Sequence, residues 1–103
     1  MSPGRGTDWA MRPVNRRGGF QIMKYTVGAA VNVEMTISGD VTGGMFGTDP
    51  ENWKRKEDIV APGEILDDLF GRAAGANTPM LYVRWEDEDG KLHLDTVEIP
   101  FPP

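Results

Sequence analysis

The C-terminal part of the chain constrains the fold more than any other segment. Two runs in which apolar and polar residues alternate, residues 80–87 and 92–99, lie on either side of residues 88–91. An Asp-Gly pair between two alternating runs is a strong hairpin pattern, because a type I′ turn needs positive φ at both of its central positions. The sequence therefore predicts an antiparallel hairpin with a two-residue turn at Asp89 and Gly90.

The register of this hairpin decides which side chains share a face. A two-residue turn would pair Trp85 with Leu94 and Arg84 with Asp95, and the side chains of each strand then alternate between the two faces. The first face contains Leu81, Val83, Trp85, Leu92 and Leu94, and the second contains Met80, Tyr82, Val97 and Ile99. Both faces of the predicted sheet are thus partly apolar, and both need cover.

The middle of the chain combines one more strand with helical patterns. Apolar residues occupy every second position of residues 24–38, and this period of two predicts a long half-buried strand. The glycine-rich residues 43–47 are predicted to form a loop. A helical turn is predicted at residues 48–51, where a cap residue precedes Pro50, with Trp53 beyond it in a charged run.

The main helix is predicted to begin at Pro62. Apolar residues follow at spacings of three and four, namely Ile65, Leu66, Leu69, Phe70 and Ala73. Together these elements predict an α+β fold, in which a small three-stranded antiparallel sheet packs on one amphipathic helix. The sheet is expected to consist of the long first strand and the C-terminal hairpin.

Residues 1–22 are rich in glycine, proline and arginine and show neither a helical nor a strand period. We therefore expect an irregular N-terminal arm, followed by a single domain over residues 23–103 that folds without it. An alternative is that the arm is a non-native leader. Residues 16–19, Arg-Arg-Gly-Gly, are what a purine-rich ribosome-binding site encodes when it is translated, and Met23 would then be the natural start.

Length and composition limit the classes of protein to consider. A chain of 103 residues with 39% hydrophobic residues is sufficient for one globular domain. It contains no cysteine, which excludes disulfides, thiolate nucleophiles and thiolate metal sites. No apolar run approaches the length needed to span a bilayer, so a cytoplasmic protein is expected, in a host cytoplasm or a virion if its origin is a bacteriophage.

The charge is unevenly distributed along the chain. The first 22 residues contain four arginines and one aspartate, whereas the rest contains 15 acidic and 7 basic residues. Such a balance argues against direct binding of nucleic acid, which requires lysines and arginines arrayed along a face. It fits either a well-solvated surface or an acidic surface that imitates nucleic acid.

The residues that carry chemistry in other proteins have no suitable context here. His93 is the only histidine, and we expect it on the surface or as the cross-strand partner of Glu86. The acidic residues 86–89 precede Gly90 but do not match the spacing of a calcium-binding loop. Asp67 and Asp68, adjacent on the predicted helix, would point apart. We therefore predict no catalytic, cofactor-binding or metal-binding residue, no cofactor, and no enzymatic activity.

The remaining hypothesis is a non-enzymatic protein-binding or assembly module, such as an accessory or structural subunit of a bacteriophage or bacterium. Its partner would be another protein, a homo-oligomer or both, without nucleic acid or membrane. The alternative is an acidic inhibitor that occupies a nucleic-acid-binding site on its target. The candidate contact residues are Trp53, Tyr82, Val97 and Ile99 for an apolar interface, and Glu86, Asp87, Glu88 and Asp89 for an acidic one.

Overall fold

The computed structural model describes residues 4–103, which form nine strands in two antiparallel sheets and no helix. The strands are β1 (Gly4–Arg5), β2 (Trp9–Pro13), β3 (Gly19–Lys24), β4 (Ala30–Ser38), β5 (Val41–Gly43), β6 (Arg55–Val60), β7 (Ile65–Arg72), β8 (Met80–Glu86) and β9 (Leu92–Glu98). The order in the five-stranded sheet is β1-β2-β3-β7-β5, and the order in the four-stranded sheet is β6-β4-β8-β9. The predicted α+β fold is therefore wrong, and the protein is all-β.

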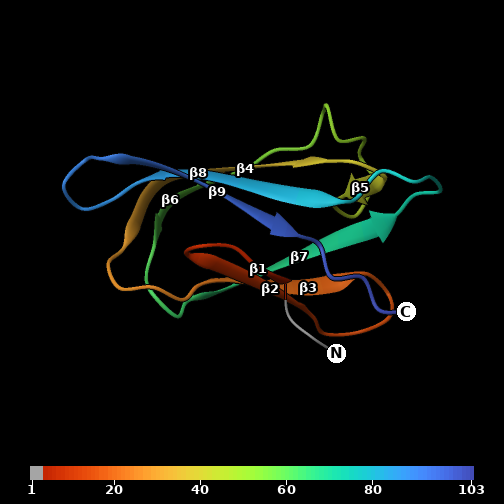
Figure 1. Ribbon diagram of the computed structural model, residues 1–103, viewed down its shortest axis with the longest axis horizontal. Helices are drawn as coiled ribbons and strands as arrows, with labels where there is room; N and C mark the ends of the chain where they lie inside the picture. Colours follow the sequence, from red (N-terminus) through yellow and green to blue (C-terminus); the bar gives the residue numbers. More distant parts are fainter. Residues whose placement is uncertain (1–3) are drawn as a thin grey trace.

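The two sheets pack face to face, as Figure 1 shows, with the hydrophobic core between them. The five-stranded sheet curls into a half-barrel whose first two strands contact β9 of the other sheet, so one side of the sandwich is closed. Both sheets contribute to the core. Its largest fully buried side chains are Trp9, Met11, Phe20, Ile22 and Phe70 from the five-stranded sheet and Met35 and Leu81 from the four-stranded sheet.

The predicted helix is the long strand β7. Leu66 and Phe70 are buried and lie four residues apart, a spacing that places two side chains on one face of a strand as well as of a helix. Asp68 lies between them, and its carboxylate is 3.1 Å from Nη1 of Arg55. Ile65 and Leu69 point to the outside. The apolar residues that suggested a helix thus belong to both faces of a strand. Because the charged Asp68 occupies an inward position, the sequence does not show the alternation that is typical of a strand.

The predicted N-terminal arm also forms part of the fold. Residues 4–22 supply β1, β2 and most of β3, and they contribute Trp9, Phe20 and Ile22 to the core. The boundary predicted at residue 22 is therefore not a structural boundary; residues 1–3 lie outside the described part. Each of these strands is too short for its alternation to stand out in the sequence.

The predicted strand over residues 24–38 is interrupted. Lys24 ends β3 and Ala30 begins β4, and Gly28 between them has a φ of 87°. Inside β4, Asn32 has a φ of 51° and marks a bulge against β8. The loop predicted at residues 43–47 is confirmed as a turn at residues 44–47, whereas Gly43 is the last residue of β5. The predicted helical turn is a single hydrogen-bonded turn, in which the carbonyl of Asp49 accepts from the amide of Trp53 at 3.0 Å.

Candidate functional site

The outer face of the four-stranded sheet exposes large apolar side chains. Leu94 of β9 is 73% exposed and Leu92 of the same strand 49%, and Tyr82 of β8 is 40% exposed. Ile59 of the edge strand β6 is also exposed, opposite Val31 of β4. An antiparallel sheet face in water is usually polar, so this face is unusual.

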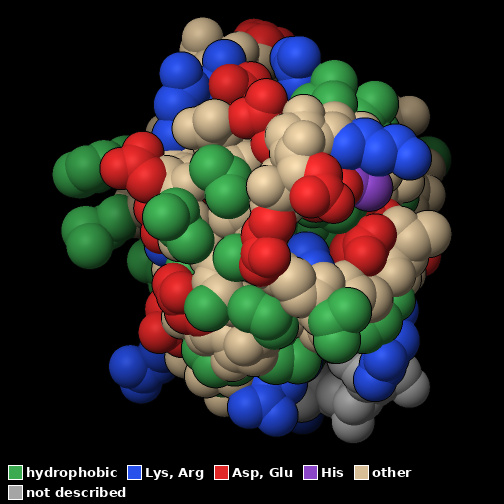
Figure 2. All heavy atoms as spheres, turned by 90° about the vertical axis from the view of Figure 1, so that its left-hand side faces the viewer, with side chains coloured by type: hydrophobic (Ala, Val, Ile, Leu, Met, Phe, Trp, Pro, Cys, Tyr) green, Lys and Arg blue, Asp and Glu red, His purple; other side chains and the backbone are tan. Residues whose placement is uncertain are grey.

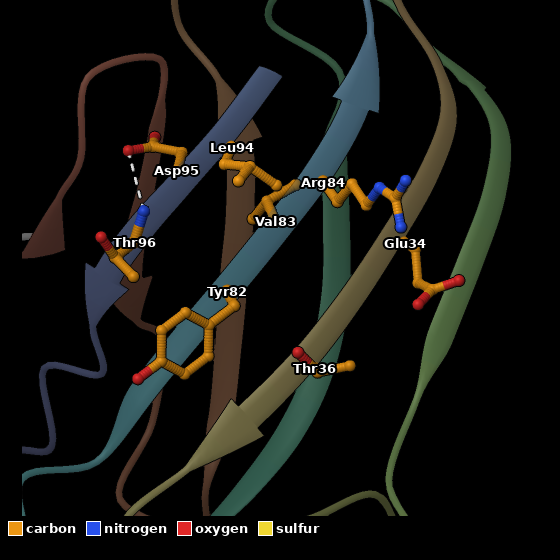
Figure 3. A pocket seen from close by; sticks show the side chains of 8 residues that line it. All are labelled: Glu34, Thr36, Tyr82, Val83, Arg84, Leu94, Asp95 and Thr96. Atoms are coloured by element: carbon orange, nitrogen blue, oxygen red, sulfur yellow. Dashed lines mark hydrogen bonds between the residues drawn. The ribbon is translucent and has the colours of Figure 1, made fainter. Parts of the chain in front are cut away.

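A hollow of about 380 Å³ lies on this face, across β4, β8 and β9. Figure 3 shows the side chains around it: Glu34 and Thr36 from β4, Tyr82 and Arg84 from β8, and Leu94 and Thr96 from β9, with Val83 and Asp95 completing the lining. Most of this lining is apolar or hydroxyl-bearing. Glu34 and Arg84 add one carboxylate and one guanidinium to this lining.

The basic side chains beside the hollow outnumber the acidic ones. The carboxylate of Glu34 lies 3.4 Å from Nζ of Lys54 and 4.0 Å from Nζ of Lys56, so two cations share one acid. Among residues 4–103, the guanidinium of Arg84 forms no ion pair. Together with these two lysines, the bases beside the hollow outnumber its lining acids, Glu34 and Asp95, by three to two, on a molecule whose net charge is −5.

The turn between β8 and β9 differs from the predicted one. The amide of Gly90 donates to the carbonyl of Asp87 at 2.9 Å, and the amide of Asp87 donates to the carbonyl of Lys91 at 2.9 Å. Gly90 has a φ of 81°, whereas Asp89 has none of the positive φ that a type I′ turn would require. The connection is a three-residue loop in which Gly90 takes the left-handed position.

This longer loop shifts the register by one residue. Arg84 pairs with Leu94 rather than with Asp95, so every side chain of β9 lies on the face opposite to the predicted one. Val97 and Ile99, predicted as contact residues, are buried in the core at 0% and 2% exposure. Of the three contact residues predicted on this face, Tyr82 is the one that is exposed.

Trp53, the fourth apolar contact candidate, is also a core residue. Its ring meets that of Phe70 edge-on, with 5.2 Å between the centroids. It covers Gly43 so closely that a Cβ there would overlap the indole. The charged sequence around Trp53 concealed this, because its neighbours lie on the edge of the sandwich while the indole points inward.

The predicted acidic contact residues serve mainly to tie the hairpin to its neighbours. Glu86 accepts a hydrogen bond from Nδ2 of Asn32 at 2.6 Å, and Glu88 accepts one from the amide of Ala29 at 2.9 Å. Asp89 is exposed. Figure 2, which views this end of the sandwich, shows acidic side chains gathered near its centre.

Asp87 organises the turn itself. Its Oδ1 accepts from the amides of Asp89 and Lys91, and its Oδ2 lies 2.7 Å from Nε2 of His93. The hydrogen bond from His93, followed by the bond from Lys91, lowers the pKa of Asp87 below its usual 3.8. His93 stacks on Trp85 at 5.2 Å between ring centroids. The partner of His93 is therefore Asp87, not Glu86 as predicted.

Two buried charged groups were missed by sequence reasoning. Asp95 is 8% exposed, and its carboxylate accepts hydrogen bonds at 2.9–3.1 Å from the hydroxyl of Thr7 and from the amides of Thr7, Asp8 and Trp9. It joins the four-stranded sheet to the loop between β1 and β2. An aspartate in an alternating strand looks like an exposed residue, so no local pattern could have identified it.

Lys24 is the second buried charge, 4% exposed at the end of β3. Its Nζ lies 2.9–3.1 Å from four oxygens of the loop between β3 and β4: the carbonyls of Thr26, Val27 and Gly28 and the hydroxyl of Thr26. The ammonium thus organises the loop from within. Its hydrogen-bonding capacity is used inside the chain, which makes it a structural group.

No residues within the described part of the chain group into a metal site: no three His, Cys, Asp or Glu side chains come together. The same residues include no helix that is long and apolar enough to cross a membrane. Comparison of the chain with protein-family models, with curated proteins and with solved structures finds no match.

Proposed function

We propose that this protein is a non-enzymatic binding or assembly module and that the outer face of the four-stranded sheet is its protein-binding surface. The observation that carries the proposal is the pair of exposed side chains Tyr82 and Leu94, which line the hollow, together with the exposed Leu92 on the same strand as Leu94. Exposed apolar patches that are bordered by charged residues are typical of protein interfaces.

The energetic argument is simple. Burying one large aliphatic side chain contributes about 1.5–3 kcal/mol, so Leu92 and Leu94 are capable of supplying part of a binding energy. Tyr82 adds an aromatic ring whose hydroxyl lies 3.0 Å from Oγ of Ser38, so the ring is already oriented. Aromatic residues contribute disproportionately to interfaces, particularly when their conformation is set before binding.

The alternative function, an acidic inhibitor that imitates nucleic acid, receives less support. The acids at residues 86–88 accept hydrogen bonds within the chain, and the outer sheet face mixes Glu34 with lysines and with Arg84. In addition, the arginines of residues 5–17 belong to the folded domain. The net charge of this domain is therefore less negative than that of residues 23–103 alone. A nucleic-acid mimic requires a continuous acidic surface.

Site-specific photo-crosslinking tests the proposal. A benzophenone side chain at Leu94, in cells that naturally produce the protein, should yield protein adducts of defined mass. The matched control is the same group at Val27, an exposed apolar residue in the loop between β3 and β4. Absence of adducts at Leu94, or equal yields at both positions, would contradict the proposed surface. Mass spectrometry of the adduct identifies the partner.

A further inference from the structure

The turn at residues 44–47, called here the Met45–Phe46 turn, presents two apolar side chains to solvent. Met45 is 79% exposed and Phe46 is 92% exposed, the latter the greatest exposure of any aromatic residue described. Burial of two such side chains would be favourable, yet no described residue of the same chain covers them. The two adjacent side chains are therefore available for contact with another molecule.

The base of this turn is firmly anchored. Gly43 and Thr48 exchange two backbone hydrogen bonds of 2.8 Å, and the amide of Gly44 donates to the carbonyl of Leu69 at 2.8 Å. Gly44 and Gly47 both have positive φ, a conformation that suits glycine and closes the turn tightly. The two side chains are therefore presented on a rigid frame, which lowers the entropic cost of docking.

We propose that the Met45–Phe46 turn of a second copy of this chain occupies the hollow on the four-stranded sheet, so that the protein self-assembles through unlike surfaces. The inference rests on the proposed function, because it names the occupant of that same surface. One copy supplies an apolar projection, and the other supplies a hollow bordered by Tyr82 and Leu94.

Charge complementarity favours a second copy as the occupant. Asp49 and Glu51 follow the turn, are exposed, and form no ion pair with any residue in the range 4–103. The hollow has the unpaired Arg84 and the lysine surplus around Glu34. Acids beside the projection and bases beside the hollow would attract one another and set the orientation.

The same charges disfavour other apolar environments. A membrane-inserting turn is usually accompanied by lysines or arginines that attract anionic headgroups. The first charged residues after the turn, Asp49 and Glu51, are acidic, and the bases that follow at residues 54–56 form ion pairs within the chain. A projection on one surface and a hollow on another make a heterologous contact, which produces rings or open chains of copies.

The absence of cysteine permits a clean test by disulfide trapping. Full-length Phe46→Cys and Leu94→Cys proteins are mixed under mild oxidation, and mixed dimers are measured on a non-reducing gel. The expected result is several-fold more mixed dimer than from Val27→Cys with Leu94→Cys. Val27 is 94% exposed, so it matches Phe46 in accessibility. Equal yields from both mixtures would overturn the inference.

A charge exchange tests the orientation. Arg84→Glu in the Leu94→Cys protein should reduce mixed dimers, and Asp49→Lys with Glu51→Lys in the Phe46→Cys protein should restore them. Failure of this restoration, in variants with unchanged thermal unfolding, would contradict the docking geometry. The photo-crosslinking test distinguishes failure of this inference from failure of the proposed function. Adducts at Leu94 with a different protein would overturn only the inference, whereas the absence of any adduct would overturn both.

Discussion

The two faces of strand β9 show opposite relations between chemistry and environment. On the inner face, Asp95 is a buried carboxylate, and on the outer face its neighbour Leu94 is 73% exposed to water. The interior accommodates Asp95 because the backbone and hydroxyl of residues 7–9 donate to it. Nothing comparable covers Leu94 among the described residues.

The difference shows which side chains the chain itself satisfies and which it leaves exposed to water. A buried carboxylate is tolerated only when donors satisfy it, and here the chain supplies them itself. An exposed leucine has no such requirement, but it gains free energy from any partner that removes it from water. The inner face therefore concerns stability, whereas the outer face is the surface that we propose for association.

The largest expected effect tests how much of the inner face depends on the N-terminal strands. A protein that begins at Met23 lacks β1, β2 and most of β3, and with them Trp9, Phe20 and Ile22. We expect it to lose cooperative thermal unfolding by circular dichroism, because the opposite sheet would face water. A sharp transition close to that of the full chain would show that the core is complete without these strands.

Substitution of Asp95 tests the buried carboxylate itself. Asp95→Asn should destabilise the fold by about 3 kcal/mol in chemical denaturation, because hydrogen bonds to a charged acceptor are replaced by weaker ones and an amide group meets other donors. The control is Glu98→Gln on the exposed side of the same strand, which should change little. Equal stability of the two variants would mean that the donors of residues 7–9 find water instead.

The turn at the end of the same hairpin should give a smaller, pH-dependent effect. Because the folded state lowers the pKa of Asp87, its ionised form stabilises the fold above pH 4, and this contribution is lost as the pH falls through the lowered pKa. The difference in melting temperature between the natural protein and Asp87→Asn should therefore be larger at pH 6 than at pH 3. A difference independent of pH would assign the effect of Asp87 to geometry alone.

The smallest effect on stability is expected on the outer face. Leu94→Lys should change the free energy of unfolding by no more than about 0.5 kcal/mol, as for other surface substitutions, while it weakens any association measured by light scattering. Leu81→Lys, on the inner face of the adjacent strand, should unfold the protein. Marked destabilisation by Leu94→Lys would place that leucine in the intrachain packing.

Some of these structural features were predictable from the sequence. The alternation over residues 80–87 and 92–99 predicted two strands, and the Asp-Gly pair predicted the hairpin; both are confirmed, as β8 and β9. The glycine-rich loop was predicted at residues 43–47, and the structure has a turn at residues 44–47. The exposed face of the hairpin was not predicted, because the loop has three residues rather than the predicted two. This one-residue shift in register turns Asp95 toward the core and Leu94 toward water.

Other elements depended on partners that are distant in the sequence. Asp68 shares the inner face of β7 with Leu66 and Phe70, and its charge is balanced there by Arg55 of β6, a partner that the local sequence does not reveal. The candidate surface likewise combines Tyr82 and Leu94 with residues of β4 some fifty positions earlier in the chain. Local patterns contain no information about such contacts.

By itself, the sequence determined the alternating strands, the hairpin and the absence of thiol chemistry, because these follow from side-chain period, turn composition and residue content. Only the tertiary structure decided that residues 65–72 are a strand, that residues 4–22 belong to the core, and which face of β9 meets water. The physical reason is that a strand, unlike a helix, makes its backbone hydrogen bonds with other segments. Its state and its register are therefore properties of the assembled sheets.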